Sequence, residues 1–179
     1  RKATNKTLSC KVRIGFNAGE NIATDVATLL SDCGVDFITI HGRTTHQGYA
    51  GEIDYDTIAK VKSMVKIPVV GNGNVFDEKS YLTLKNTGCD AVMVARGALG
   101  DPNIFARLKG EKEQNLYSLL TDHVATLKQY YPANMLNLYM KKHLLWYLKN
   151  IPNCQSLKKY ICDCQNLDDA IAEIAKVLG

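Results

Sequence analysis

The sequence has no long apolar segment, and this absence argues against several classes of protein. No run approaches the ~20 consecutive apolar residues that a membrane-spanning helix requires, so we expect no membrane partner. The first six residues are polar and no apolar segment follows them, which is not the pattern of a secretory signal peptide. The chain begins with Arg1 instead of methionine, and we therefore expect a fragment or a processed piece of a longer protein.

The cysteines lack the spacing of a metal site or of a disulfide framework. Several of the six lie within apolar strand or helix patterns instead of loops. Cys162 and Cys164 have no second ligand pair at the spacing that is typical of zinc. We therefore predict reduced thiols, a cytoplasmic location and no metal.

The charge of the chain is small but uneven. The net charge is +4, and 46% hydrophobic with 22% charged residues is ordinary for a globular protein of 179 residues. Lysine and arginine outnumber aspartate and glutamate by nine to three in residues 107–160, compared with twelve to eleven in residues 1–106 and one to four in residues 161–179. The middle block is therefore a candidate surface for binding a polyanion.

Four apolar segments, each followed by an amphipathic one, predict an α/β protein with a parallel sheet. We expect strands at residues 10–14, 36–41, from 68 onward and 90–95, with helices at residues 21–34, 54–65 and 77–87. The strands start roughly 23 to 32 residues apart, which is the rhythm of βαβ units with right-handed crossovers.

Four such units are half of a (β/α)8 barrel, which takes about 250 residues. The predicted fold is the second half of a (β/α)8 TIM barrel, strands 5–8, in residues 1–108; a small doubly wound sheet is the alternative. We favour the half barrel because polar side chains of Lys11, Arg13, Thr39 and His41 share one strand face near the carboxyl end, where a barrel would place them around a ligand.

From Asp101 onward the pattern is helical, which predicts an all-α domain in residues 109–179. We expect helices at residues 115–131, 134–150 and 167–178, separated by prolines. The second of these helices leaves a polar stripe that consists of Asn137, Lys141, Lys142 and Lys149. Together with Lys158 and Lys159, these lysines can follow a phosphate backbone, although a solvated face with snorkelling lysines is the alternative.

Two glycine-bearing turns follow the third and fourth strands and are typical of a phosphate cradle. The segments are Pro68-Val69-Val70-Gly71-Asn72-Gly73-Asn74 and Ala91-Val92-Met93-Val94-Ala95-Arg96-Gly97. Glycines let backbone N–H groups approach an anion, and Arg96 supplies a fork for phosphate oxygens. Tight turns alone explain either segment; two consecutive turns, the second with an arginine, favour a phosphate site.

The polar residues near these two turns are of the types that bind a flavin. A flavin needs an anchored phosphate, a cation near the pyrimidine edge of its ring and a polar group beside the ring. Lys11 at the mouth of the first strand suits the cation, His41 closes the second strand on the same face, and Arg43 follows it. Singly, Lys11 and His41 also fit ordinary barrel and core positions.

Four motifs together resemble the tRNA-dihydrouridine synthases, above all their bacterial B-type branch. They are Ile40-His41-Gly42-Arg43-Thr44, Pro68 to Asn74, Arg96 to Phe105, and Met140-Lys141-Lys142-His143-Leu144-Leu145-Trp146-Tyr147-Leu148-Lys149. The resemblance spans nearly the whole chain. It implies a barrel that binds FMN, with NADPH as the reductant of the FMN, and a helical carboxyl-terminal domain that binds tRNA.

The resemblance also implies roles for individual residues. Lys11 and His41 would contact the flavin, and Arg43 would lie near the target nucleotide. The helical domain would meet tRNA through Lys141, Lys142 and Lys149. The phosphate of FMN would be held by Asn72, Gly73, Asn74, Ala95 and Arg96.

The chain departs from the family pattern at two positions and in its coverage. Asn74 stands where the family usually has aspartate, and Ala95 where it usually has glycine. The first half of the barrel, which carries the general-acid cysteine, is not represented. We therefore expect no catalytic residue in this chain, an inactive fragment, and a partner that is either the missing amino-terminal half barrel or a second copy. The alternatives are a non-catalytic RNA-binding module or self-associating half barrel, and another FMN-dependent oxidoreductase that acts on a small molecule.

Overall fold

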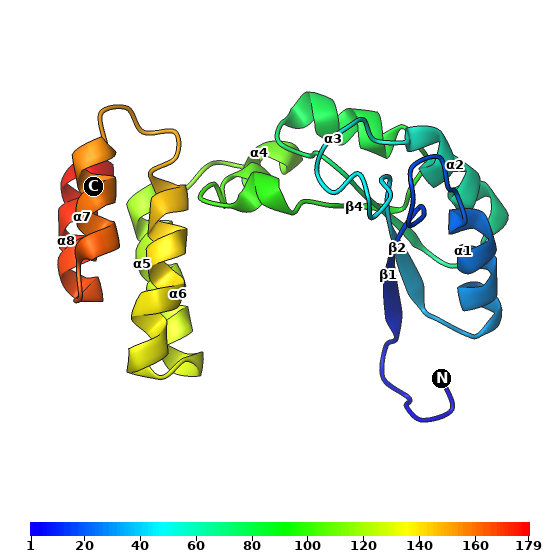
Figure 1. Ribbon diagram of the computed structural model, residues 1–179, viewed down its shortest axis with the longest axis horizontal. Helices are drawn as coiled ribbons and strands as arrows, with labels where there is room; N and C mark the ends of the chain where they lie inside the picture. Colours follow the sequence, from blue (N-terminus) through cyan, green and yellow to red (C-terminus); the bar gives the residue numbers. More distant parts are fainter. The chain divides into compact units, whose positions relative to one another are not determined.

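The structure, a computed structural model, describes residues 1–179, with the exception of the side chain of Asn134. Its elements can be followed from the amino to the carboxyl terminus in Figure 1. The chain divides into two compact units, residues 1–97 and residues 98–179. The boundary expected after residue 108 falls inside the second unit, so the domains 1–108 and 109–179 stay a prediction.

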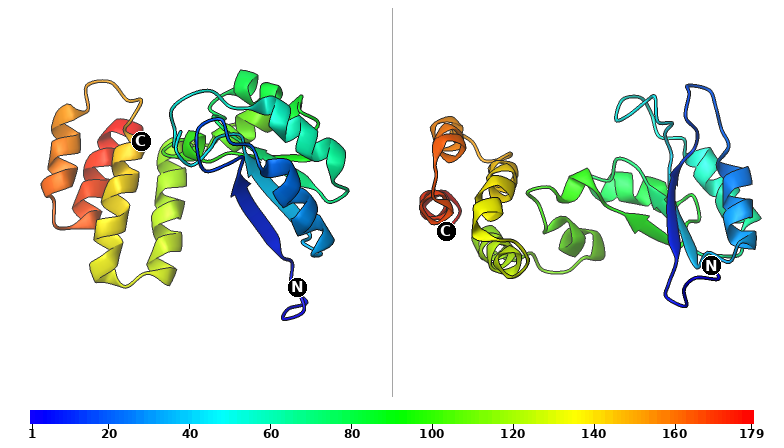
Figure 2. Two further views of the ribbon diagram at one scale, coloured as in Figure 1. Left: turned by 45° about the vertical axis from the view of Figure 1, so that its right-hand side comes forward. Right: turned by 60° about the horizontal axis from the view of Figure 1, so that its bottom comes forward.

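The first unit is an α/β fold around a four-stranded parallel sheet. The strands lie in sequence order, β1-β2-β3-β4, and every neighbouring pair is parallel. The elements are β1 (Ser9–Arg13), α1 (Ala23–Asp32), β2 (Phe37–His41), α2 (Tyr55–Met64), β3 (Val69–Asn72), α3 (Glu78–Lys85) and β4 (Ala91–Met93). The α/β fold and the parallel sheet predicted from the sequence are thus confirmed, and the three helices lie along one face of the sheet (Figures 1 and 2).

Local sequence explains why α2 starts and packs where it does. The carboxylate of Asp54 accepts a hydrogen bond from the backbone N–H of Thr57 at 2.8 Å, which satisfies a donor at the helix start. One turn further, Ile58 and Val61 are completely buried, as is Ile40 in β2. The buried side of α2 therefore covers the face of the sheet on which Ile40 lies.

Helix α1 packs differently from the stripe that its sequence predicts. The helical period of the sequence places Ile22, Val26, Leu29, Leu30 and Cys33 on one face. Of these, Val26 and Leu30 are partly buried, and the other three are exposed. The buried positions are Ala23 and Ala27, both with no exposed surface. Small side chains let the helix approach its neighbours closely, so the larger apolar residues remain on its outer side.

The strand register places two rows of side chains across the sheet at its carboxyl end. Arg13 pairs with His41 and His41 with Asn72. Two residues earlier, Lys11 pairs with Thr39. Because side chains alternate along a strand, the two rows point to the same face, away from α1–α3. The shared polar face predicted for β1 and β2 is thus present.

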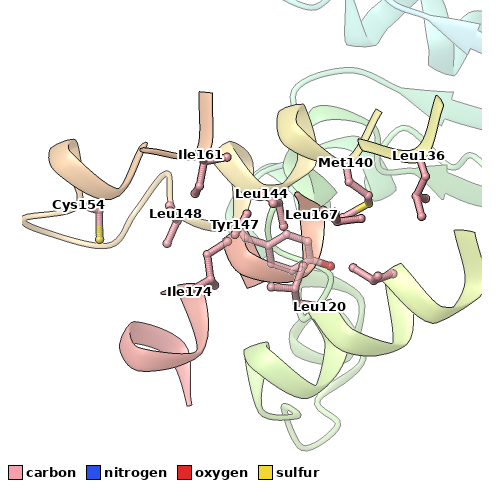
Figure 3. Close-up of a cluster of buried hydrophobic side chains, with 12 residues drawn as sticks. Leu120, Leu136, Met140, Leu144, Tyr147, Leu148, Cys154, Ile161, Leu167 and Ile174 are labelled. Carbon is pink, nitrogen blue, oxygen red and sulfur yellow. The ribbon is translucent and has the colours of Figure 1, made fainter. Parts of the chain in front are cut away.

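The second unit is helical. After a short 3-10 turn at Arg96–Ala98, its elements are α4 (Ile104–Lys109), α5 (Leu116–Tyr130), α6 (Ala133–Tyr147), α7 (Gln155–Asp163) and α8 (Leu167–Leu178). Helices α5 to α8 enclose an apolar core in which Leu120, Met140, Leu144, Ile161 and Ile174 are completely buried (Figure 3).

Two features of this unit differ from the prediction. Helix α7 was not expected, and Ile161 in its last turn joins the core. Helix α6 ends at Tyr147, so Lys149 lies in the turn that follows it and not on the helix. Among the described residues, none of the helices combines the length and the apolar character that a membrane crossing requires.

Candidate functional site

The turn after β3 is shaped by close contacts that leave no room for a side chain at Gly73. This glycine has φ +154°, and a Cβ atom there would lie 2.5 Å from Cδ1 of Ile53. The preceding Asn72 donates from Nδ2 to the carbonyl oxygen of Met93 at 3.0 Å, which ties the end of β3 to the end of β4. The two glycine-bearing turns are therefore held together at the carboxyl edge of the sheet.

A pocket of about 190 Å³ lies at this edge. It contains every residue for which the sequence predicted contact with the cofactor: Lys11, His41, Asn72, Gly73, Asn74, Ala95 and Arg96. The remaining lining residues are Arg13, Tyr49, Val75, Phe76 and Gly97. Residues from the ends of all four strands thus converge on one cavity.

The pocket is strongly cationic. Lys11, Arg13 and Arg96 line it, and no aspartate or glutamate is among its lining residues. Burial, followed by the charge of Arg13, lowers the pKa of Lys11. Burial and the surrounding cations lower the pKa of His41 to about 4, so this imidazole is neutral at pH 7. The site is therefore suited to an anion with more than one negative charge.

The guanidinium of Arg96 is held from several sides. Its Nη2 donates to Oδ1 of Asn74 at 2.9 Å. The ring of Tyr49 lies under it with 4.1 Å between Cζ and the ring centroid, and the ring of Phe76 lies at 5.6 Å. Stacking and hydrogen bonding together fix the direction of the fork before any ligand binds.

Arg43 lies behind the pocket instead of lining it. Its side chain is 1% exposed. Its guanidinium donates to the carbonyl oxygen of Gly51 and, from Nη1, to Oδ1 of Asn74 at 3.0 Å. Arg43 therefore contacts a lining residue, Asn74, but does not line the pocket itself. Its expected position near a target nucleotide stays a prediction.

The five lining residues that were absent from the predicted site include Arg13 and Tyr49. Arg13 was recognised only as a polar residue of the strand; its Nη1 donates to the carbonyl oxygens of Thr44 at 2.6 Å and Gly48 at 3.2 Å, which holds the loop after β2. Its alternation with Lys11 was the signal that would have included it. Tyr49 comes from that same loop, and no local sequence pattern indicates that it folds back over Arg96.

In the helical unit, the predicted polar stripe is not one free surface. Asn137 donates from Nδ2 to the carbonyl oxygen of Gln165 at 2.6 Å, and Lys141 donates from Nζ to that of Cys162 at 2.8 Å. Both side chains therefore bind the segment formed by α7 and the turn after it. The expectation of a continuous stripe was wrong for these two residues because it did not include α7.

Lys142 and Lys149 remain exposed. The Nζ atom of Lys142 lies 5.4 Å from the centroid of the Trp146 ring. Tyr139, three residues before Lys142 on α6, has its ring 4.9 Å from the ring of Tyr131 at the end of α5. An exposed lysine between aromatic rings on one helix face is suited to a nucleic acid, which offers both phosphates and stacking surfaces.

The comparison with known families decides which proteins this chain is related to. A family model described as "Dihydrouridine synthase (Dus)" matches residues 1–178. The chain belongs to the dihydrouridine synthase family. The resemblance drawn from the four motifs is thereby confirmed.

Individual relatives agree with this membership. The chain is 33% identical over 178 residues to "Probable tRNA-dihydrouridine synthase 1" of Synechocystis, which covers 93% of this chain and 50% of that protein. It is 30% identical to "tRNA-dihydrouridine synthase B" of Pseudomonas aeruginosa, with 97% and 55% covered. For "Probable tRNA-dihydrouridine synthase" of Rickettsia prowazekii the identity is 32%, with 98% and 56% covered. The chain spans about half the length of these dihydrouridine synthases.

Proposed function

We propose that the chain is the carboxyl-terminal half of a flavin-dependent tRNA-dihydrouridine synthase, an oxidoreductase that reduces the C5=C6 bond of specific uridines in tRNA. The observation that carries this proposal is the cationic pocket at the strand ends, where all residues expected to contact FMN come together. The dihydrouridine synthase model that matches residues 1–178 supports the reaction, and the printed names of the relatives support tRNA as the substrate.

The residues present fit the phosphate end of FMN. Three cations and no carboxylate line the pocket, and Gly73 allows the backbone to approach an anion closely. The volume of about 190 Å³ is below the ~300–1,000 Å³ of pockets that enclose a whole ligand. We infer that this chain anchors the phosphate through Asn72, Gly73, Ala95 and Arg96, and that other parts of the barrel complete the site for the ring.

FMN, reduced by NADPH, would supply the hydride that is added to C6 of the uridine. Lys11 contributes a cation that balances negative charge at the ring, and His41, neutral at pH 7, contributes hydrogen bonds without adding charge. The proton for C5 is expected from a cysteine outside this chain, and no cysteine is among the lining residues of the pocket. The purified chain alone is therefore expected to be inactive.

The half-barrel layout follows from the same proposal. Four parallel strands in sequence order, with their helices on one face, are what the second half of a (β/α)8 barrel would contribute. The partner that completes the barrel is the missing amino-terminal half or a second copy of the chain. In this proposal residues 1–108 belong to the barrel and residues 109–179 to the tRNA-binding domain, and the cytoplasmic location remains a prediction.

The helical unit would supply the grip on tRNA. A uridine must be unstacked to reach the flavin, which costs a few kcal/mol, and contacts to phosphates elsewhere offset that cost. Residues 107–160 carry nine basic against three acidic residues. Lys142 and Lys149 are the exposed members of the predicted set, whereas Lys141 acts mainly through its bond to the carbonyl oxygen of Cys162.

A fluorescence titration of FMN tests the enzyme against an RNA-binding module without cofactor. We expect saturable quenching of FMN by the chain and at least tenfold weaker binding by Arg96→Met. Lys79→Met, which removes the same charge from the exposed surface of α3, is the control and should bind as the unchanged chain does. Equal FMN affinity in both variants, or no binding at all, would contradict the phosphate site.

A gel-shift titration with tRNA tests the substrate. Lys142→Glu should weaken binding several-fold at low salt and reduce the steepness of its salt dependence, because one phosphate contact is lost. The control Lys79→Glu introduces the same charge change outside the helical unit. If the two variants behave alike, the exposed face of α6 is not the tRNA surface, and a flavoenzyme that acts on a small molecule becomes the better description.

A further inference from the structure

Helix α1 carries a row of apolar side chains that the described part of the chain leaves largely uncovered. The row, which we call the α1 stripe, consists of Ile22, Val26, Leu29 and Cys33. Their spacing of four, three and four residues places them on one side of the helix. Leu29 is 63% exposed and Ile22 43%, and Cys33 is exposed as well. Single exposed apolar residues are common, but a row along a whole helix indicates a contact surface.

The α1 stripe is turned away from the neighbouring helix. Helix α1 packs against α2, and Nδ2 of Asn21 donates to Oγ1 of Thr57 in the first turn of α2. The completely buried Ala23 and Ala27 mark the side of α1 that meets the sheet. One flank of α1 is therefore covered by α2, and the exposed stripe lies on the other flank.

Strand β1, which lies beneath that flank, is also incompletely covered. It is the edge strand of the sheet, and α1 contacts both β1 and β2. Cys10 and Val12 point to the helix-covered face of the sheet and are only partly buried. Their register partners in β2, Ile38 and Ile40, are completely buried. The α1 stripe and the outer side of β1 thus form one apolar corner at the end of the helix layer.

The charges beside the α1 stripe favour one kind of partner. Asp25 and Asp32 are exposed next to the stripe, on the side of the helix away from the sheet, and α1 contains no lysine or arginine. Two copies of the chain joined edge to edge through this corner would bring their aspartates together, which is unfavourable. A different helix, with lysine or arginine along the matching edge, would pair with them instead.

We propose that the α1 stripe and the outer side of β1 are the docking surface for one amphipathic helix of the amino-terminal half barrel, a helix with an apolar side and a basic edge. This inference rests on the proposed half-barrel layout and names the surface through which the two halves recognise each other. The chain spans about half the length of its relatives, so a partner of similar size fits the proposal. The free edge of β1 would add backbone hydrogen bonds to a strand of the same partner.

Co-expression tests the apolar part of this surface. The probe is the amino-terminal half of "tRNA-dihydrouridine synthase B" of Pseudomonas aeruginosa, of which the chain covers 55%. Leu29→Lys should reduce the amount of that half that co-purifies with the chain at least tenfold, because it places a charge in the apolar contact. The control is Leu82→Lys on α3, where Leu82 is 47% exposed on the side opposite the buried Leu84. This variant should bind as the unchanged chain does.

A charge reversal tests the predicted basic edge of the partner. Asp25→Lys should weaken the complex several-fold at low salt and less at high salt, because an attractive pair becomes a repulsive one. Asp56→Lys is the matched control, since Asp56 is an exposed aspartate in the first turn of α2. Equal affinity of the two variants would overturn the basic edge.

Thiol labelling shows where the partner lies. Cys33 at the end of the stripe and Cys162 in the helical unit are both exposed. In the complex, we expect the half barrel to slow the reaction of Cys33 with a maleimide at least tenfold and to leave Cys162 as reactive as in the chain alone.

The outcomes separate this inference from the layout on which it rests. If the half binds equally well to Leu29→Lys and Leu82→Lys, or leaves Cys33 unprotected, the docking surface is overturned while the half-barrel layout stands. Sedimentation in which the chain alone forms a dimer that Leu29→Lys dissociates would assign the stripe to a second copy and also overturn the inference. If the unchanged chain does not bind the half at all, both the inference and the half-barrel layout fall.

Discussion

Protonation of His41 tests the electrostatics of the pocket most sharply. The pKa of this group is lowered from 6.5 to about 4 by burial first, and then by the charges of Arg13, Lys11, Arg43 and Arg96. Each pKa unit corresponds to about 1.4 kcal/mol, so charging His41 in the folded chain costs up to about 3 kcal/mol. Because the folded pKa is below the unfolded one, the stability from neutral His41 is present above pH 6.5 and is lost between pH 6.5 and 4, with about 2 kcal/mol lost at pH 5.

Nuclear magnetic resonance of the imidazole protons measures this directly, since the chain contains only four histidines. We expect one signal, absent from His41→Asn, to titrate with a midpoint near 4. Added sulfate should raise that midpoint, because an anion among the cations favours the charged imidazole, and Arg13→Met should raise it as well. His46→Asn is the control and should leave the signal in place. A midpoint of 6 or higher that does not respond to sulfate would show that burial and the neighbouring cations do not keep His41 neutral.

Two further predictions concern the helical unit. Leu144→Ala should lower the free energy of unfolding by about 2–5 kcal/mol, because this side chain is completely buried. Leu138→Ala is the control and should change the free energy little, because Leu138 is 72% exposed. Urea unfolding followed by Trp146 fluorescence compares the two variants. Gly100→Ala should destabilise this unit much more than Gly88→Ala destabilises the other unit. Both glycines have positive φ, but a Cβ atom at residue 100 would collide with the carbonyl oxygen of Trp146, whereas one at residue 88 would meet no atom within 4 Å. Equal costs within either pair would contradict the packing described.

The sequence was sufficient for the sheet and for most of the pocket. Short apolar runs that end in glycine-bearing turns are typical of buried parallel strands. The register between the strands then determines which side chains lie next to each other. Lys11, His41 and Arg96 come together because the parallel strands that carry or precede them end at the same edge of one sheet, which the βαβ rhythm implies. The same rhythm does not say how a loop folds, and Tyr49 therefore could not be placed over Arg96 beforehand.

The helical unit was less predictable because the partners of its helices are distant in sequence and one of its helices was not expected. In α7, Leu157 and Ile161 lie on the buried side, but the helix has only nine residues, so few positions carry its pattern. Lys141 then looked like a surface residue, although its Nζ binds a carbonyl oxygen of that helix. In α1, the large apolar residues suggested one face, and close packing through Ala23 and Ala27 selected another.

The proposed function requires the pocket to recognise the phosphate of a flavin nucleotide. The most direct measurement is a competition titration of the chain with FMN, riboflavin and inorganic phosphate under the same conditions. We expect FMN to bind at least tenfold more tightly than riboflavin and inorganic phosphate to displace FMN. Riboflavin binding as tight as FMN binding, with no displacement by phosphate, would contradict the claim.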